Sequence, residues 1–354
     1  MTKTTRFSDA EAVLVRHVDA RTTPAAAAAV VHSDQVTWTC AVGSHTYDEG
    51  ALPTRVDDLF DLASVTKVVA TATLCAMLVD DGRLDIDQPV GKSIPEFAGE
   101  GKGAITPRHL LSHSSGMPAH VHLYDAMRDR REIVEAAIVL ELDYAPGSAS
   151  VYSDMGYIVL GELIERLCGE TLDELFRERI TGLMKLAETM FHPEVGQERI
   201  VPTEYDRTMR MCLVHGEVHD ENAWAMGGVA PHAGLFSNVE DLGRCVRMWL
   251  RKGQLDGRRV LSEAVVDLFT QRNERVSDST WALGWDTVSQ GSTSGRTFSE
   301  RSYGILGFTG TSLWVDPERD LGVVLLTNRV HPTRDSEGIK RLRPEFHDAV
   351  SEGM

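Results

Sequence analysis

Cysteine is scarce in this sequence, with five residues at scattered positions among 354 and no C-x-x-C pair. An odd and dispersed set of cysteines predicts neither a disulfide framework nor a zinc site. The histidines His219, His232, His120 and His122 do not stand at the spacing typical of metal ligands. We therefore expect no metal and no cofactor.

Positive charge is also in deficit. Lysine and arginine number 36 against 53 aspartates and glutamates, so the formal net charge is −17 and the pI is near 5.2. This balance disfavours nucleic acid and anionic membrane surfaces as partners. The oligomeric state is left open by the sequence.

Long apolar runs are missing as well. The first 20 residues lack the apolar core of a signal peptide, and no apolar run reaches the ~18 residues that span a bilayer. The composition, 42% hydrophobic and 25% charged, is that of a globular protein. We expect a cytoplasmic protein.

What the sequence does contain is a stretch from Leu59 to Gly82 that combines an apolar helix with a candidate nucleophile. From Val65 to Val79 nearly every residue is apolar, which predicts a helix buried on all sides. The residues that follow, Asp80-Asp81-Gly82, are typical of a helix end.

Ser64 and Lys67 stand three residues apart at the start of this helix, a spacing that places both side chains on one face. A serine nucleophile needs a base, and a lysine serves when burial lowers its pKa. The positive end of the helix dipole also stabilises negative charge at Ser64. In the simpler alternative, Ser64 caps the helix and Lys67 extends to the surface.

Tyr152 and Asp154 precede another apolar helix, just after the turn Ala145-Pro146-Gly147. A tyrosine on such a loop can approach Ser64 and carry a proton between nucleophile and leaving group. The alternative is an ordinary half-buried tyrosine, with Asp154 as a helix cap.

Residues 302–314 predict a strand interrupted by glycines at 304, 307 and 310. Glycine within a strand often marks the close approach of another backbone or a ligand. A backbone N–H at this strand edge could bind a substrate carbonyl and complete an oxyanion hole with the N–H of Ser64. The alternative is a glycine-rich hairpin.

The remaining segments predict an α/β (α+β) fold, an antiparallel sheet flanked by N- and C-terminal helices with an inserted all-helical domain. The sheet domain would comprise residues 1–82 and 216–354, the helical domain residues 83–215, and Ser64 would lie at their seam. Strands are expected over residues 25–32, 36–42, 281–286, 302–306, 311–315 and 321–327, and helices over 9–19, 129–142, 154–168, 172–180, 239–251, 263–271 and 345–350, with a further helix from Pro107.

The order S-x-x-K, Y-x-N/D and glycine-containing strand resembles the serine β-lactamase-like and penicillin-recognising family, above all its class C β-lactamase and esterase branch. Residues 109–118 (HLLSHSSGMP), 161–165 (GELIE), 233–237 (AGLFS) and 314–317 (WVDP) are similar too. The resemblance implies catalysis through an acyl-enzyme. Ser64 would be the nucleophile, Lys67 the base or proton relay, and Tyr152 the residue that passes a proton to the leaving group.

The sequence departs from the family at the third motif, which is usually Lys or His, then Thr or Ser, then Gly. The preferred alignment places Ile305, Leu306 and Gly307 there, with the oxyanion N–H on Phe308; a rival alignment uses residues 308–310. Either way the cation that helps bind a substrate carboxylate is missing.

Asp154 stands where β-lactamases usually have Asn, and its charge should favour protonated Lys67. Tyr152 then becomes the better candidate for the base. Asp154 and residues 305–307 would line the substrate site, and His219 lies on a polar loop that could also reach the substrate.

We therefore predict a cytoplasmic serine hydrolase or acyltransferase acting on esters or amides of neutral or amine-bearing small molecules, with water or an amine as acceptor. It could be an esterase or a transacylase of natural-product biosynthesis. The alternatives are a non-catalytic binding or sensor protein on the same fold, and a weak β-lactamase or D-aminoacyl peptidase.

Overall fold

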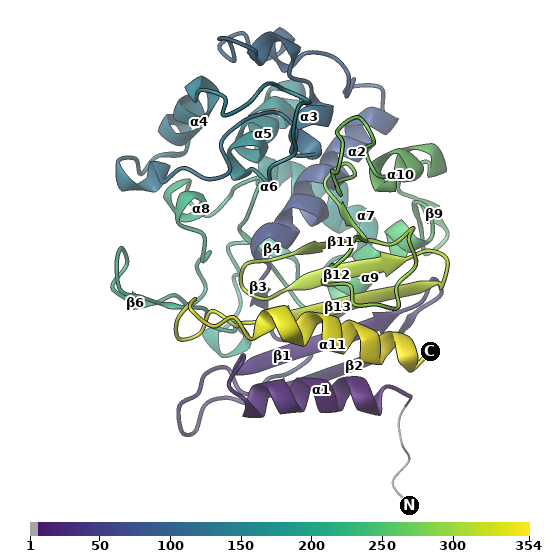
Figure 1. Cartoon of the computed structure of the whole chain (residues 1–354). Helices are drawn as coiled ribbons and strands as arrows, with labels where there is room; N and C mark the ends of the chain where they lie inside the picture. Colours follow the sequence, from purple (N-terminus) through teal and green to yellow (C-terminus); the bar gives the residue numbers. More distant parts are fainter. Residues whose placement is uncertain (1–5) are drawn as a thin grey trace, which may run out of the picture.

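The computed structural model describes residues 6–354, and a six-stranded antiparallel sheet forms its centre (Figure 1). The strand order β10-β11-β12-β13-β1-β2 brings both ends of the chain into one sheet. β1 and β13 join these ends, for example through the pair Ala29 and Val324. The strands are β1 (Ala25–Val31), β2 (Val36–Gly43), β10 (Asp286–Thr287), β11 (Tyr303–Leu306), β12 (Ser312–Asp316) and β13 (Leu321–Thr327).

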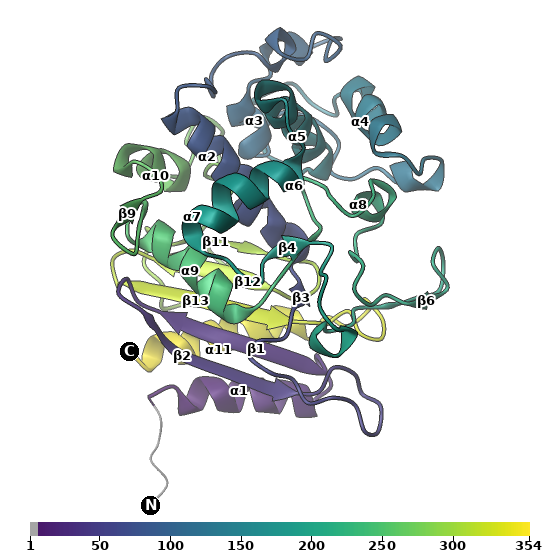
Figure 2. The same ribbon diagram turned by 180° about the vertical axis from the view of Figure 1, so that it is seen from behind.

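Helices cover both faces of this sheet. α1 (Ser8–Asp19) and α11 (Ile339–Glu352) pack side by side on one face, where Leu14 and Phe346 join a buried cluster (Figure 1). α9 (Val239–Leu250) lies on the other face (Figure 2), and a Cβ on Gly322 of β13 would meet Val246 of α9 at 2.1 Å. The central strands are buried along their whole length, which explains their continuous apolar sequences.

The apolar stretch after residue 62 forms a long helix in three parts. A 3₁₀ turn, η1 (Ala63–Val65), leads into a π-helical segment, η2 (Lys67–Ala72), and then into α2 (Thr73–Asp80). Contrary to the sequence-based expectation, Ala63–Asp80 is long and apolar enough to cross a membrane, with 18 residues and a mean hydropathy of 1.4. Since 83% of it is buried inside the protein, it is placed as a core helix.

Helices also dominate the region between α2 and residue 190, and α3 packs against α5 there. The α-helices outside the sheet layers are α3 (Pro107–Leu111), α4 (Arg130–Val139), α5 (Asp154–Cys168), α6 (Leu172–Leu175), α7 (Gly182–Met184), α8 (Glu221–Ala225) and α10 (Glu263–Thr270), and the shorter helical turns are η3 (Val90–Lys92), η4 (Lys102–Ala104), η5 (Leu123–Asp125), η6 (Phe176–Thr181) and η7 (Gln197–Arg199).

Short strands complete the structure. A three-stranded sheet has the order β3 (Phe60–Asp61), β7 (Leu235–Ser237), β4 (Met190–Phe191), and β3 directly precedes η1 in the chain. Two further pairs of strands are formed by β5 (Tyr205–Asp206) with β6 (Cys212–Leu213) and by β8 (Gln254–Leu255) with β9 (Arg258–Arg259). The predicted fold class is confirmed. β4, β5 and β6 fall inside residues 83–215, and the domain boundaries stay a prediction.

Two elements differ from their predictions. Residues 281–285 form a tight turn instead of a strand, because Ala282 N–H donates to Trp285 O and Gly284 has a φ of +94°. The last helix begins at Ile339, so Pro344 lies inside it instead of opening it. Pro344 is the sixth residue of this helix, where its ring cannot donate the i→i−4 hydrogen bond to the carbonyl of Lys340.

Candidate active site

Ser64 is presented on a sharp turn at the start of the buried helix. Ala63 has a φ of +47°, an unusual value for a residue other than glycine. The buried carboxylate of Asp61 holds this turn, since its Oδ1 accepts the N–H of Ala63 at 2.7 Å and its Oδ2 accepts that of His219 at 2.6 Å. Leu62, not Ser64, stands at the N-cap of η1, and the Ser64 hydroxyl contacts Lys67 Nζ, which argues against the simple capping role.

Lys67 is fully buried and points toward Ser64. Its Nζ donates to Ser64 Oγ at 3.0 Å and to the carbonyl of His232 at 3.1 Å, and it pairs with Asp154 Oδ1 at 2.7 Å. The alternative in which Lys67 extends to the surface is therefore wrong. The serine hydroxyl, the ammonium and the carboxylate form one chain of contacts.

Asp154 is free to meet Lys67 because another residue caps its helix. Ser153 is the N-cap of α5 and accepts the N–H of Gly156 on its Oγ at 3.0 Å. The second oxygen of Asp154 lies 3.3 Å from Nδ1 of His120. Burial alone would raise the pKa of Asp154, but the Lys67 ammonium and His120 outweigh it and hold this pKa well below its usual range.

The same contacts determine the protonation of Lys67 and Tyr152. Burial alone would lower the pKa of Lys67, but the charge of Asp154 and the contact with Tyr152 raise it. Burial raises the pKa of Tyr152, and the Lys67 ammonium, 4.8 Å from the ring centroid, opposes that rise. At neutral pH the resting site therefore holds a lysine ammonium, an aspartate and a neutral tyrosine.

His113 supports Tyr152 from behind. Its ring centroid lies 4.5 Å from that of Tyr152 and 4.4 Å from that of Trp281. The backbone N–H of Ser153 donates to its Nδ1 at 3.0 Å, so the neutral ring carries its proton on Nε2. Burial and the charge of Lys67 lower its pKa to about 3. In the sequence, the stretch 109–118 marks only the family resemblance and carries no local signal for this role of His113.

The turn between β11 and β12 lies against the turn of Ser64. The hydroxyl of Thr309 donates to the carbonyl of Asp61 at 2.8 Å, and that of Thr311 donates to the carbonyl of Leu62 at 2.9 Å. The N–H groups of Ser64 and Phe308 donate to no atom within residues 6–354. Both are thus available to bind an oxyanion.

Ser64 opens into a cavity of about 560 Å³. Tyr152, Trp281 and Phe308 line it together with the predicted residues 305–307. Sequence reasoning missed four basic residues of the lining, which come from the segment after β13 and from α11, without any motif to mark them. They are Arg329, Arg334, Lys340 and Arg343.

The four cations differ in their partners. Arg334 pairs with Glu204 and Glu221, and Lys340 pairs with Glu337. Within the part of the chain that the structure describes, Arg329 and Arg343 have no carboxylate partner, and both donate to backbone carbonyls. Two guanidinium groups therefore keep their positive charge at the cavity.

Two predicted substrate contacts are placed differently. His219 is 3% exposed and lies behind Phe308, with the ring centroids 5.7 Å apart and its Nε2 2.9 Å from Glu204. It supports Phe308 instead of reaching the substrate. Asp154 is not among the cavity-lining residues and acts on Lys67, because its carboxylate is turned toward the ammonium.

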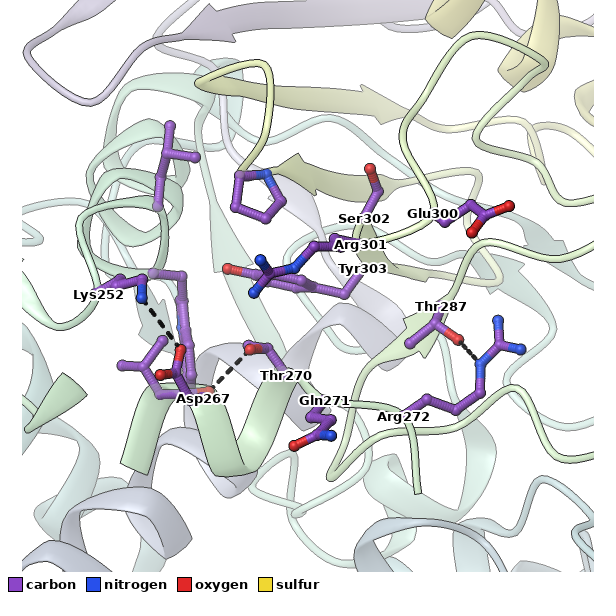
Figure 3. A pocket seen from close by; sticks show the side chains of 14 residues that line it. Lys252, Asp267, Thr270, Gln271, Arg272, Thr287, Glu300, Arg301, Ser302 and Tyr303 are labelled. Carbon is purple, nitrogen blue, oxygen red and sulfur yellow. Dashed lines mark hydrogen bonds and ion pairs between the residues drawn. The ribbon is translucent and has the colours of Figure 1, made fainter. Parts of the chain in front are cut away.

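A second cavity, of about 450 Å³, lies beside β11 and α10 (Figure 3). Lys252 and Asp267 approach each other there at 3.5 Å, and Arg272 donates to Thr287 at 2.7 Å. None of the three catalytic candidates lines it. Among residues 6–354, no group of three or more His, Cys, Asp or Glu side chains is placed to hold a metal ion.

The chain is similar to known proteins over most of its length. The family model "Beta-lactamase" matches residues 10–347. The N-acetylmuramyl-L-alanine amidase of Bacillus subtilis (strain 168) is 34% identical over 312 residues, which are 79% of this chain and 70% of the amidase.

Solved structures share the fold at lower identity. A penicillin-binding protein homologue from Caulobacter crescentus has a TM-score of 0.78 at 22% identity, covering 99% of this chain and 98% of its own. EstCE1, described as a hydrolase with promiscuous acyltransferase activity, has a TM-score of 0.78 at 20% identity and covers 98% of both chains.

Proposed function

The chain belongs to the beta-lactamase family, and from this premise we propose that it is a serine hydrolase that cleaves an amide bond in a small substrate carrying a carboxylate. The coarser activity, a serine hydrolase or acyltransferase of this family, follows from the family match and the relatives. The bond, the charge of the substrate and the acceptor are the proposal.

The observation that carries it is the pair of guanidinium groups without carboxylate partners, Arg329 and Arg343, in the same cavity as Ser64. A guanidinium at a partly dry site favours a carboxylate. We therefore propose a substrate with a carboxylate in place of the neutral or amine-bearing substrates that the sequence predicted. The sequence-based prediction rested on the cation that is missing at Ile305. Arg329 and Arg343 instead come from the segment after β13 and from α11. The name of the amidase relative supports an amide as the target.

Acylation begins when Ser64 Oγ attacks the carbonyl carbon of the substrate. Its proton passes to the phenolate form of Tyr152, while the N–H groups of Ser64 and Phe308 stabilise the oxyanion. Collapse of the tetrahedral intermediate breaks the C–N bond. The leaving amine takes the proton from Tyr152, and the acyl group stays on Ser64.

Deacylation repeats the sequence with water. Water attacks the ester on Ser64, gives a proton to Tyr152, and the acid leaves as Ser64 Oγ recovers that proton. An amine acceptor would follow the same path to a new amide. Because burial raises the pKa of Tyr152, the phenolate is a minor species at neutral pH, and we expect turnover to rise toward alkaline pH.

The test compares N-acetyl-L-alanine with N-acetylethylamine, which lacks the carboxylate. We expect kcat/KM to favour the carboxylate by about tenfold or more, as a charged hydrogen bond is worth about 1.5–3 kcal/mol. Arg329→Gln should reduce the ratio of the two kcat/KM values. Arg341→Gln changes an exposed arginine of α11 and should leave the ratio unchanged. Ser64→Ala should abolish turnover of both substrates. Equal kcat/KM for both substrates would contradict the proposed carboxylate.

The alternative of a non-catalytic binding protein draws only on the altered third motif. Ser64, Lys67 and Tyr152 are all in place, and both oxyanion N–H groups lack a hydrogen-bond acceptor among residues 6–354. Labelling of Ser64 by an activated ester, followed by release of the acyl group, would separate the enzyme from the binding protein.

The cytoplasmic location stays a prediction of the sequence, which fractionation of the source cells would check.

A further inference from the structure

We propose that Arg343 is a positioning residue for the oxyanion hole, holding the peptide between Gly307 and Phe308 so that the Phe308 N–H faces the cavity. The role rests on the proposed acyl-enzyme function, because an oxyanion forms only in that chemistry. It assigns a task to a residue that lies 279 positions after Ser64 (343 − 64).

The geometry of the hydrogen bonds points to this role. Nη2 of Arg343 donates to Gly307 O at 2.7 Å and to Thr311 O at 2.8 Å. Gly307 O and the Phe308 N–H belong to one planar peptide unit, in which they point in opposite directions. A bond that fixes the oxygen therefore fixes the direction of the N–H.

The position needs such a clamp because Gly307 has no side chain to restrict rotation of the following peptide. A side chain there is not an option, since a Cβ would lie 2.0 Å from Thr311 Oγ1 and 2.5 Å from Leu62 O. The close contact with the Ser64 turn thus demands glycine, and glycine by itself leaves the peptide free to flip. Arg343 supplies the missing restriction.

The next carbonyl is held in the same way. Arg329 Nε donates to Phe308 O at 2.7 Å, while Gly310 N–H donates to Gly307 O at 3.0 Å and Gly307 N–H to Thr311 O at 2.8 Å. The peptide oxygens on both sides of Phe308 are therefore occupied, and its N–H is left free. A flip of the Gly307–Phe308 peptide would break two hydrogen bonds at one oxygen.

The charge of Arg343 adds to the effect. The residue is 7% exposed, and burial together with the nearby Arg329 lowers its pKa to about 9. It is therefore cationic at neutral pH. A charged donor on Gly307 O polarises the peptide and makes the Phe308 N–H a stronger donor to an oxyanion.

The test uses Arg343→Met and Arg343→Lys, with Arg341→Met as the exposed control on the same helix, and p-nitrophenyl butyrate as a neutral substrate. We expect Arg343→Met to lower kcat by about 10² with little change in KM, and Arg343→Lys to fall between it and the parent. Phenylboronic acid, which forms a tetrahedral adduct on a serine, should lose affinity by a similar factor. Guanidinium added to Arg343→Ala should restore part of kcat.

A folded Arg343→Met protein with unchanged kcat on the neutral ester would overturn the proposal, because an arginine that only binds a substrate carboxylate affects anionic substrates alone.

A second measurement is independent of turnover. With ¹⁵N-labelled phenylalanine, the Phe308 amide resonance should move in Arg343→Met and Arg343→Lys and stay in place in Arg341→Met. An unmoved resonance would refute the clamp even in an inactive protein. A moved resonance in a protein that never acylates Ser64 would refute the proposed function and leave the clamp standing.

Discussion

At the scale of single residues, Asp154 determines which group near Ser64 can act as a base. Its carboxylate lies 2.7 Å from Lys67 Nζ and, with Tyr152, raises the pKa of that ammonium despite complete burial. An asparagine there would accept a hydrogen bond without the charge. Burial would then dominate and lower the pKa of Lys67.

We accordingly predict that Asp154→Asn moves the acidic limb of kcat/KM to lower pH. In the parent, Lys67 stays protonated up to its raised pKa, so a neutral amine is absent below it. In the variant that pKa falls, and the amine becomes available as a base at lower pH. A pH profile of both proteins measures this shift.

Asp125→Asn is the matched control for this change, because the Asp125 carboxylate is 69% exposed and ends the η5 turn that follows His120. Its profile should follow that of the parent. Coincident profiles for the parent and Asp154→Asn would remove Asp154 from the account of the base.

At the scale of elements, two threonines fasten the β11–β12 turn to the turn of Ser64. Thr309 and Thr311 are fully buried, and their hydroxyls reach the carbonyls of Asp61 and Leu62. The two oxyanion N–H groups come from these two segments. Their alignment therefore depends on contacts between residues about 250 positions apart.

Thr311→Val keeps the shape of this side chain and removes one of two donors to the carbonyl of Leu62, which still accepts the N–H of Val65 at 3.1 Å. We expect a loss of about 0.5–1.5 kcal/mol in the free energy of unfolding, the net value of one hydrogen bond, together with a fall in kcat from poorer alignment of the hole. Urea denaturation and ester turnover give the two values. Thr333→Val, exposed and bonded only to Asp335, should change neither, and a Thr311→Val protein as stable and active as the parent would argue against this fastening.

At the scale of the whole molecule, the sheet and the helical region share one core. The helix Ala63–Asp80 packs against the sheet and against α5, and one continuous buried cluster contains Ala27 of β1, Val68 of η2 and Leu160 of α5. When residues 83–215 are separated from the rest of the chain, much of their apolar surface therefore loses its contact with the helix Ala63–Asp80.

We predict that a protein of residues 83–215 alone does not unfold cooperatively on heating, because the exposed face of α5 has lost the buried helix. Circular dichroism during a thermal scan, beside the full chain as control, measures this. A sharp transition in the isolated segment would show that it is an independent domain and would support the boundaries predicted from the sequence.

The sequence by itself determined the elements and the catalytic motifs. The apolar run after Ser64 predicted a buried helix, the β-branched and alanine-rich strands had no polar face, and S-x-x-K, Y-S-D and the glycines of 304–310 marked three segments of the site. The helices and strands follow from local periodicity, which acts over a few neighbouring residues, whereas the catalytic roles of the three motifs are implied by the family resemblance.

Only the tertiary structure decided which distant side chains share the cavity. The basic wall of Arg329 and Arg343, the support of Tyr152 by His113 and the place of His219 behind Phe308 depend on packing between segments far apart in the chain. No local pattern encodes such contacts, because they arise when both chain ends enter one sheet. That is why the sequence could indicate an acyl-enzyme at Ser64 but not the basic residues that line its cavity.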